Sequence, residues 1–228
     1  MKSIIMKTVL SVSVIFSAIL FSCAQNTGTK KQTTNTTTKN NMKEDTVKLK
    51  ATGVATFANG CFWCTEAIFE ELKGVITAVS GYSGGHTENP TYKQVSYEET
   101  GHAECLQITY DTSVITFDEL LEVFWETHDP TTLNRQGADR GTQYRSAIFY
   151  HNDEQKQKAE KYKAELDKSG AFNNPIVTEI TPFTKFYEAE DYHQQYNELN
   201  GDKNPYCSIV IRPKLEKFRK VFAAKLKN

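Results

Sequence analysis

The sequence predicts an α+β fold: a ferredoxin-like, split βαβ sandwich of two layers, followed by a long irregular C-terminal segment. Two observations lead to this class. Local patterns predict the order strand, helix, strand, strand, helix, strand, helix, strand. That order contains two β-α-β units whose strands can return side by side in one sheet, and no internal repeat interrupts it.

The first β-α-β unit is expected near the start of the folded region. Its strand, helix and strand are predicted at residues 51–58, 61–72 and 75–82. Asn59-Gly60 is a turn signal between the first strand and the helix. Apolar residues recur at helical spacing within the helix, and Gly74 suits its C-terminal cap. Residues 81–92 contain several glycines and are predicted to form a loop.

The second unit begins with a strand at residues 103–110. Thr116 and Glu119 form a capping-box pattern, which opens an amphipathic helix that runs through Trp125. The unit closes with a strand at residues 146–150.

The remaining elements are less regular. Residues 129–144 are polar and are predicted to be irregular. Asn152, with Gln155 three residues later, is a helix-start signal. From Phe183 onward the chain is predicted to be mostly irregular. The last predicted elements are a solvent-facing helix, a strand and a short helical piece, at residues 153–168, 176–180 and about 188–199.

The start of the chain is predicted to lie outside the folded domain. Residues 1–22 combine a basic start with an apolar stretch that is too short to span a bilayer as a helix, which takes ~20 residues, and so predict a signal peptide. The stretch ends in Leu20-Phe21-Ser22-Cys23, which resembles the lipobox of bacterial lipoproteins, where cleavage leaves a lipidated cysteine. A cleaved signal peptide without lipid is the alternative.

Residues 23–46 are rich in Thr, Asn, Lys and Gln, and they cannot bury enough apolar surface to offset the entropy of ordering. They are predicted to be a flexible tether for one domain at residues 47–228. The lipid on Cys23 would hold this domain, outside the cytoplasm, at a membrane of the bacterial cell envelope.

Composition narrows the function of the domain. The formal net charge of the 228-residue chain is −1 and no basic block occurs, which argues against a nucleic-acid partner. Four of the five cysteines remain once Cys23 is assigned to lipid. An exported domain permits disulfides, but four cysteines are too few to staple a domain of this length, so redox chemistry is the better interpretation.

Cys61, in the run Gly60-Cys61-Phe62-Trp63-Cys64, is the predicted centre of the chemistry. A cysteine reacts as its thiolate, and a free pKa of about 8.5 leaves little thiolate at neutral pH. The predicted helix start favours the anion through unpaired N–H groups and the helix dipole. Phe62 and Trp63 would line a small apolar pocket beside the sulfur. The alternative is an inert buried thiol among core aromatic residues.

Cys64 lies three residues after Cys61, so both sulfurs can share one helix face. A Cys-x-x-Cys pair at a helix start is a redox arrangement in which the second thiol can resolve the oxidised first. It can also begin a zinc site, but Cys105 and Cys207 are not a second ligand pair of suitable spacing, so no metal is predicted. Cys105 lies in a strand pattern and is predicted to be a small buried hydrophobe.

The run Gly60-Cys61-Phe62-Trp63, followed by Glu66, resembles the active-site signature of the A-type peptide methionine sulfoxide reductases. Further motifs of that family stand in family order and at family spacing, and the resemblance covers residues 53 to 212. These motifs are Gly81-Tyr82-Ser83-Gly84-Gly85, Asn89-Pro90-Thr91-Tyr92, Thr100-Gly101-His102-Ala103-Glu104, His128-Asp129-Pro130-Thr131, Asn134-Arg135-Gln136-Gly137, Asp139, Gly141-Thr142-Gln143-Tyr144-Arg145-Ser146, Phe186-Tyr187, Ala189-Glu190 and Tyr192-His193-Gln194.

The resemblance implies a reaction and the groups that carry it. Cys61 would attack the sulfur of a methionine sulfoxide, and Phe62 and Trp63 would hold the methyl group of the substrate. Glu104 would donate a proton toward the sulfoxide oxygen, because burial raises the pKa of a carboxyl and keeps it in the donor form. The polar side of the site would be formed by Tyr92, Tyr144 and Asp139.

The implied activity is reduction of the S epimer of methionine sulfoxide, free or in oxidised proteins, by a monomer without a cofactor. The first products would be methionine and a sulfenic acid on Cys61. Cys207 is the preferred residue to resolve this acid because a tail loop can move to it; Cys64 is the alternative, and both can act in series. A thioredoxin-like dithiol would reduce the final disulfide.

Two rival functions stay open. A thioredoxin-like disulfide oxidoreductase would use the Cys61/Cys64 pair directly, but Phe62 and Trp63 do not suit a surface that docks another protein's disulfide. A lipid-tethered binding module would use the aromatic pocket for a ligand and would yield no methionine.

Overall fold

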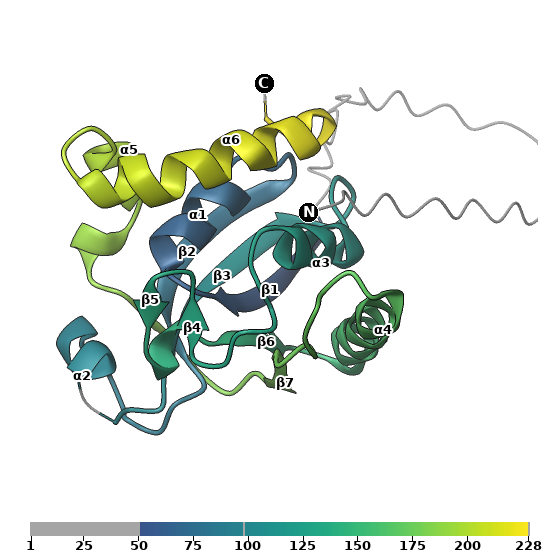
Figure 1. Cartoon of the computed structure of the whole chain (residues 1–228), viewed down its shortest axis with the longest axis horizontal. Coiled ribbons are helices and arrows are strands. Elements are labelled where there is room, and N and C mark those ends of the chain that lie inside the picture. The colour runs from purple at the N-terminus through teal and green to yellow at the C-terminus, as the bar shows by residue number, and fades with distance from the viewer. Residues whose placement is uncertain (1–50, 98, 228) are drawn as a thin grey trace, which may run out of the picture. The chain divides into compact units, whose positions relative to one another are not determined.

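The computed structural model describes residues 51–97 and 99–227. The predicted signal peptide, the tether and the lipidated Cys23 lie outside the described residues. The described domain is built on a six-stranded sheet with the order β7-β6-β1-β3-β2-β8 (Figure 1). Its strands are β1 Thr52–Asn59, β2 Val75–Ser83, β3 Ala103–Asp111, β6 Ser146–Tyr150, β7 Glu179–Pro182 and β8 Phe186–Glu188.

The four inner strands pair antiparallel with one another in the order β6-β1-β3-β2. At one edge β8 pairs antiparallel with the end of β2, and at the other edge β7 pairs parallel with β6. Helix α1 (Phe62–Phe69) connects β1 to β2, and helix α3 (Phe117–Glu126) lies between β3 and β6 in the chain. These elements confirm the α+β class.

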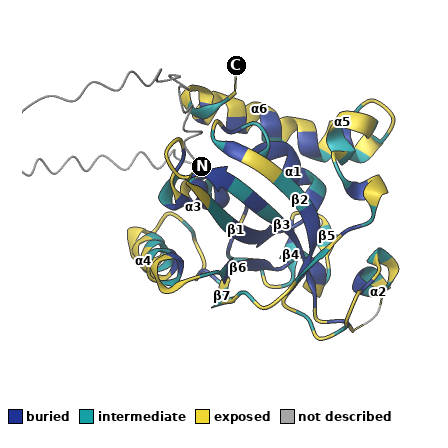
Figure 2. Ribbon diagram, turned by 180° about the vertical axis from the view of Figure 1, so that it is seen from behind, coloured by how far each residue is buried: buried dark blue, intermediate teal, exposed yellow. Residues whose placement is uncertain are grey.

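The main hydrophobic core lies on one face of the sheet. Strand residues such as Phe57 and Leu106 pack there with α1, α3 and the C-terminal helix α6 (Arg212–Val221). Helix α6 runs beside α1 in Figures 1 and 2, and strands β1 and β3 are mostly buried, as Figure 2 shows. The opposite face holds a smaller cluster around Cys105 and Phe149. Because side chains alternate along a strand, successive residues of β3 reach these two different environments.

Two predicted helix starts are confirmed by their caps. The Glu119 N–H donates to the Thr116 hydroxyl at 3.2 Å, and the Thr116 N–H donates to the Glu119 carboxylate at 2.9 Å. The side chain of Asn152 caps α4 (Asp153–Ser169) by accepting from the N–H of Gln155 at 2.9 Å. Both caps satisfy backbone donors that have no partner inside the helix.

The prediction of an irregular C-terminal segment is wrong. After β8 come helix α5 (Tyr196–Asn200), a π-helical turn (Cys207–Ile211) and the ten-residue helix α6. Leu215 and Phe218 lie one helical turn apart and are buried in the main core. Burial of this apolar stripe stabilises α6 although most of its other residues are charged.

Smaller differences concern element boundaries. Helix α1 ends at Phe69 rather than at Leu72, because Leu72 instead forms a β-bridge with Leu226. The strand predicted at 176–180 begins later, as β7 at Glu179, since the Val177 N–H bonds to the Pro130 carbonyl, outside the sheet. The short helical piece predicted at about 188–199 corresponds to the 3-10 turn Asp191–His193 and to α5. Elements that were not predicted include β8, helix α2 (Tyr92–Tyr97), the hairpin strands β4 (Arg135–Gln136) and β5 (Asp139–Arg140), and the 3-10 turns Thr142–Tyr144 and Ala223–Lys225. Within the described ranges, no helix is both long enough and apolar enough to cross a membrane.

Candidate active site

Cys61 lies at the junction of β1 and α1, as the sequence predicts. Its carbonyl oxygen accepts hydrogen bonds from the N–H groups of Cys64 at 3.1 Å and Thr65 at 3.3 Å, so Cys61 is the N-cap residue of the helix. The preceding Gly60 has a φ of 101°, and a Cβ atom there would lie 2.6 Å from the side chain of Gln136. Only glycine fits both this backbone angle and the space beside it.

The thiols of Cys61 and Cys64 are hydrogen-bonded to each other, and both are buried, with 7% of Cys61 exposed. Burial raises the pKa of Cys61 well above its ordinary value, and the hydrogen bond with Cys64 and the charge of Glu104 raise it further. The same hydrogen bond lowers the pKa of Cys64 to about 7. The helix start alone predicted an anion on Cys61, and this prediction is wrong for the resting site. Burial outweighs the helix start at Cys61, and it is the pKa of Cys64 that is lowered.

Glu104 is the carboxyl that the fold brings to this pair. It lies on β3 on the same face as Leu106, and only 1% of it is exposed. Its Oε2 accepts a hydrogen bond at 3.1 Å from the N–H of Phe62, one of the unpaired donors in the first turn of α1. Burial raises the pKa of Glu104 to about 8; the Phe62 N–H opposes the rise and the charge of Asp139 adds to it. The carboxyl therefore holds its proton at neutral pH.

Phe62 and Trp63 form the predicted aromatic wall, and a distant segment completes it. The buried ring of Phe62 lies 5.0 Å from the ring of His193. The indole of Trp63 stacks on the ring of Tyr196, with centroids 3.7 Å apart. Both partners belong to residues 189–207, which we call the C-terminal cover. Sequence reasoning did not assign these two contacts, because aromatic residues in a tail carry no signal of what they stack on.

Tyr92 and Tyr144 approach Glu104 from two separate segments. Tyr92 is the first residue of α2, and its ring lies nearly parallel to that of Phe62 at 6.4 Å. Tyr144 ends the 3-10 turn before β6. Burial raises the pKa of both phenols, and the nearby charge of Glu104 raises both further. The two hydroxyls therefore stay protonated and can donate hydrogen bonds into the site.

Asp139 has a partner that sequence reasoning missed. Its Oδ2 accepts a hydrogen bond at 2.6 Å from the hydroxyl of Tyr206, and this hydroxyl lies 3.9 Å from the Sγ atom of Cys64. Burial raises the pKa of Tyr206, as do the charges of Cys61 and Cys64. Tyr206 thus connects the C-terminal cover to the thiol pair and to β5. Its position directly before Cys207 is the sequence signal that could have found it.

The two other cysteines have different surroundings. Cys207 is 1% exposed and belongs to the main core, and burial together with the charge of Cys64 raises its pKa. It begins a packed π-helical turn, whereas a mobile loop was expected. Cys105 is buried on the opposite face of β3, near Phe149, as expected for a small hydrophobe. In the part of the chain that the structure describes, no group of three His, Cys, Asp or Glu side chains could hold a metal ion.

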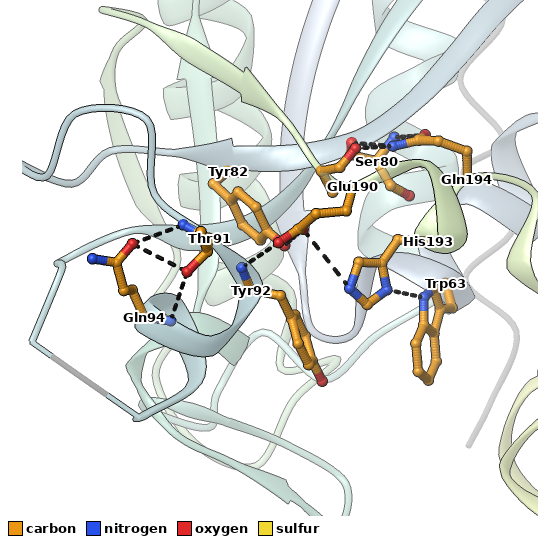
Figure 3. A network of polar contacts seen from close by, with 10 residues as sticks. Trp63, Ser80, Tyr82, Thr91, Tyr92, Gln94, Glu190, His193 and Gln194 are labelled. Atoms are coloured by element: carbon orange, nitrogen blue, oxygen red, sulfur yellow. Dashed lines mark hydrogen bonds and ion pairs between the residues drawn. The ribbon is translucent and has the colours of Figure 1, made fainter.

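A polar network connects Tyr92 to Trp63 behind the aromatic wall (Figure 3). Glu190 accepts hydrogen bonds from the backbone N–H of Tyr92 at 2.8 Å and from the hydroxyl of Tyr82 at 2.9 Å. His193 Nδ1 accepts a hydrogen bond from the indole N–H of Trp63 at 3.1 Å. Sequence reasoning gave no role to Glu190, although it stands in one of the matched motifs.

Known proteins are similar to this chain in sequence. The family model for peptide methionine sulfoxide reductase matches residues 53–226. The chain is 55% identical over 174 residues to peptide methionine sulfoxide reductase MsrA of Saccharolobus solfataricus, an alignment that covers 76% of this chain and 97% of that protein. It is 56% identical over 175 residues to peptide methionine sulfoxide reductase MsrA 1 of Rhodopirellula baltica, with 77% and 90% covered.

Two solved structures are also similar. Mxr1 from Saccharomyces cerevisiae in reduced form matches with a TM-score of 0.61 and 37% identity, over 67% of this chain and 88% of that chain. Methionine sulfoxide reductase A of Corynebacterium diphtheriae matches with a TM-score of 0.61 and 39% identity, over 68% and 78% of the two chains. A family match over most of the described domain, together with the thiol pair, the protonated carboxyl and the aromatic wall, shows that the chain belongs to the peptide methionine sulfoxide reductase family.

Proposed function

We propose that this chain reduces methionine S-sulfoxide, free or in oxidised proteins, to methionine. The observation that carries the proposal is the pairing of a buried, protonated Glu104 with the thiol of Cys61 at the start of α1, fixed by the 3.1 Å hydrogen bond from the Phe62 N–H. This arrangement supplies a sulfur nucleophile and a proton donor in one desolvated space.

In the first step the sulfur of Cys61 attacks the sulfur of the sulfoxide. The sulfoxide oxygen takes the proton of Glu104, its bond to the substrate sulfur breaks, and it becomes the hydroxyl of a sulfenic acid on Cys61. The proton of the Cys61 thiol returns to the Glu104 carboxylate, and the substrate departs as methionine. Tyr92 and Tyr144 donate hydrogen bonds to that oxygen as negative charge develops on it. A protonated Glu104 also removes the charge that would otherwise raise the pKa of Cys61.

The substrate is bound through its methyl group and through its polar sulfoxide group. The methyl group lies against Phe62 and Trp63, and burial of this apolar surface contributes binding energy. Asp139 keeps the polar side in place by holding the hydroxyl of Tyr206 at 2.6 Å.

In the second step a thiol displaces the hydroxyl of the sulfenic acid as water and forms a disulfide. The hydrogen bond between Cys61 and Cys64 supports Cys64 as the first partner. Cys207 then attacks the sulfur of Cys64, which releases the thiol of Cys61 and moves the disulfide to Cys64 and Cys207. The position of Cys207, whose pKa responds to the charge of Cys64, supports this order. Direct attack of Cys207 on Cys61, the route preferred from the sequence, is the competing path.

The last disulfide is reduced by an external thioredoxin-like dithiol, which becomes a disulfide in exchange. This returns both cysteines to thiols. Over the whole cycle the sulfoxide oxygen leaves as water and the dithiol supplies two electrons. The enzyme acts as a monomer without a metal or organic cofactor.

A disulfide oxidoreductase that uses the Cys61/Cys64 pair is the second candidate. The pKa of Cys64 near 7 favours it, since such values are typical of Cys-x-x-Cys redox pairs. The burial of both thiols beneath Trp63 and Tyr206 argues against it, because a partner disulfide must reach the attacking sulfur.

The chain is exported and lipid-anchored through Cys23 to a membrane of the bacterial cell envelope, with residues 1–22 removed as a signal peptide and residues 23–46 as the tether of the domain at 47–228. The lipobox-like run before Cys23 supports this. Phase partitioning of the expressed chain in Triton X-114 tests it. The wild-type chain should enter the detergent phase and Cys23→Ala should not; equal partitioning would contradict lipidation.

The inner part of the domain is the split βαβ arrangement expected from the sequence. The strand order β6-β1-β3-β2, with α1 and α3 as the two connections, supports this finer description.

The activity is tested with the purified full-length chain, dithiothreitol and the separated S and R epimers of a methionine sulfoxide. Methionine should form from the S epimer in many turnovers and not from the R epimer. No methionine from either epimer would contradict the function, and equal rates on both would contradict the stereochemical part.

A further inference from the structure

Two walls of the substrate pocket come from different helices. Trp63 belongs to α1, which is packed into the main core, whereas Tyr92 begins α2. Helix α2 is six residues long, and Val95 is its one buried residue. Packing of α2 therefore contributes little to the position of Tyr92, and other contacts must set the distance between the two walls.

The carboxylate of Glu190 lies beside the backbone N–H of Tyr92 and faces His193, which bonds to Trp63 (Figure 3). Its Oε1 accepts from the Tyr92 N–H at 2.8 Å, and its Oε2 accepts from the Tyr82 hydroxyl at 2.9 Å and lies 4.0 Å from Nε2 of His193. Although burial acts to raise the pKa of Glu190, the hydrogen bonds from Tyr92 and Tyr82 lower it overall. Glu190 is therefore an ionised acceptor, and its hydrogen bonds are charge-assisted.

His193 extends this contact to Trp63. The indole N–H can only donate, so Nδ1 of His193 is the unprotonated acceptor and Nε2 carries the proton. Nε2 is buried without a hydrogen-bond partner among the described residues, and the carboxylate of Glu190 is the charge it faces. Burial lowers the pKa of His193, so the ring is neutral, and the negative charge of Glu190 favours the tautomer that Trp63 requires.

The backbone around Glu190 is itself fixed to the sheet. The N–H of Ala189 donates to the carbonyl of Ser80 on β2 at 2.9 Å. The side chain of Gln194 accepts from the Ser80 N–H and donates to the Ser80 carbonyl, each at 3.0 Å. Because both flanks of Glu190 are bonded to one residue of β2, the carboxylate has a defined place relative to α1 and α2.

We propose that Glu190 is a positioning residue for sulfoxide reduction, whose carboxylate sets the tyrosine wall through the backbone of Tyr92 and the tryptophan wall through His193. This rests on the proposed function, since the pocket it shapes is the one for the methyl group of the sulfoxide. Glu190 acts through other residues, so substrate binding depends on it while the intrinsic reactivity of Cys61 does not.

The first test follows the surroundings of Trp63 by NMR in the full-length chain, which contains two tryptophans. Their indole N–H groups give two signals in a ¹H–¹⁵N NMR spectrum, and Trp125→Phe identifies the signal of Trp63. In Glu190→Gln the Trp63 signal should shift while the Trp125 signal stays. Glu188→Gln, which removes an exposed carboxylate two residues earlier, is the matched control and should move neither. An unmoved Trp63 signal in Glu190→Gln would overturn the proposal.

The second test separates binding from reactivity. Glu190→Gln should raise the KM for the S epimer about tenfold, the effect of losing one charge-assisted hydrogen bond. The rate at which iodoacetamide alkylates Cys61, followed by peptide mass, should change less than about twofold, as in Glu188→Gln. A KM that stays unchanged in Glu190→Gln would contradict positioning. An alkylation rate that changes as much as the KM would contradict it as well. If the wild-type chain forms no methionine, the proposed function fails, and the indole signals still test the link from Glu190 to Trp63.

Discussion

The start of α1 and the C-terminal cover meet in one site but are held by different kinds of contact. At the start of α1, backbone groups fix the chemistry, since the Phe62 N–H holds Glu104 at 3.1 Å and the Cys61 carbonyl accepts two helix N–H groups. The C-terminal cover reaches the catalytic residues through side chains, such as the Tyr196 ring on Trp63. Contacts of the second kind can open locally without unfolding the sheet.

This difference separates the chemical step from access and recycling. The nucleophile and the proton donor lie on the part that backbone hydrogen bonds hold rigid, as proton transfer over short distances requires. Cys207, which has to pass a disulfide outward, lies at the end of the C-terminal cover. The following changes test this division, beginning with the largest expected effect.

Replacing the nucleophile is the most severe test of the rigid part. In Cys61→Ser a hydroxyl replaces the thiol and cannot attack a sulfoxide, so methionine formation should fall by at least about 10⁴-fold. Cys105→Ala is the matched control, because it removes a buried thiol from the opposite face of β3. The measurement is methionine released in a single turnover. Comparable product from Cys61→Ser would assign the attack to another sulfur, with Cys64 the nearest.

Removing the proton donor should have the next largest effect. Glu104→Gln keeps the size of the side chain but loses the acid, so the single-turnover rate should fall about 10²- to 10⁴-fold.

The dependence of the single-turnover rate on pH also tests the role of Glu104. The pKa of Glu104 is raised to about 8, so the wild-type rate should fall as the pH rises through 8 and the carboxyl loses its proton. That decline should be absent in Glu104→Gln. If the variant keeps it, the titrating group is elsewhere, for instance in the thiol pair.

The two candidate resolving cysteines test the link between the regions. Cys64→Ser and Cys207→Ser should each still release one equivalent of methionine at close to the wild-type rate, because the attack by Cys61 is intact. Multiple turnover with a thioredoxin-like dithiol should then fall about tenfold or more in each variant. The route through Cys64 predicts a Cys61–Cys64 disulfide in oxidised Cys207→Ser, detected by peptide mass. A sulfenic acid that persists in that variant would favour direct attack by Cys207.

Replacement of Glu66 should have the smallest effect, and it should change the free energy of unfolding rather than the reaction rate. Burial raises the pKa of this α1 carboxyl to about 7, and the N–H groups of Gln195 and Tyr196 in the C-terminal cover oppose the rise. Its Oε1 has no hydrogen-bond partner in the described residues. Because the folded pKa exceeds the unfolded one, the contribution of Glu66 to stability is full below about pH 4.5 and is lost as pH rises through 7.

Glu66→Gln removes this titration. The variant should therefore gain on the order of 2 kcal/mol in free energy of unfolding at pH 8 relative to wild type, and little at pH 4. Urea unfolding at the two pH values measures it, with the exposed Glu188→Gln as control. An equal shift at both pH values would mean that the amide repacks the site and that titration is not the cause.

Much of the fold was predictable because its signals are local. The capping box at Thr116 and Glu119 and the cap at Asn152 lie within four residues of the groups they satisfy, and both predictions are confirmed. The C-terminal segment was predicted wrongly, because α6 is stabilised by burying Leu215 and Phe218 in the main core, where it packs beside α1, far away in the chain. Its own sequence is mostly charged, and burial against a distant surface leaves little local pattern.

The identity of the reacting groups can be read from the sequence: a cysteine placed by a strand, Asn59-Gly60 and a helix start, with an ordered set of motifs that includes Glu104. The protonation state and the surroundings of those groups depend on the folded domain. The pKa of Glu104 near 8, the opposite pKa shifts of Cys61 and Cys64, and the Glu190–His193 link to Trp63 all arise from burial and from residues brought together by the fold. Electrostatic energies depend on distance and desolvation in space, and the order of residues along a chain specifies neither.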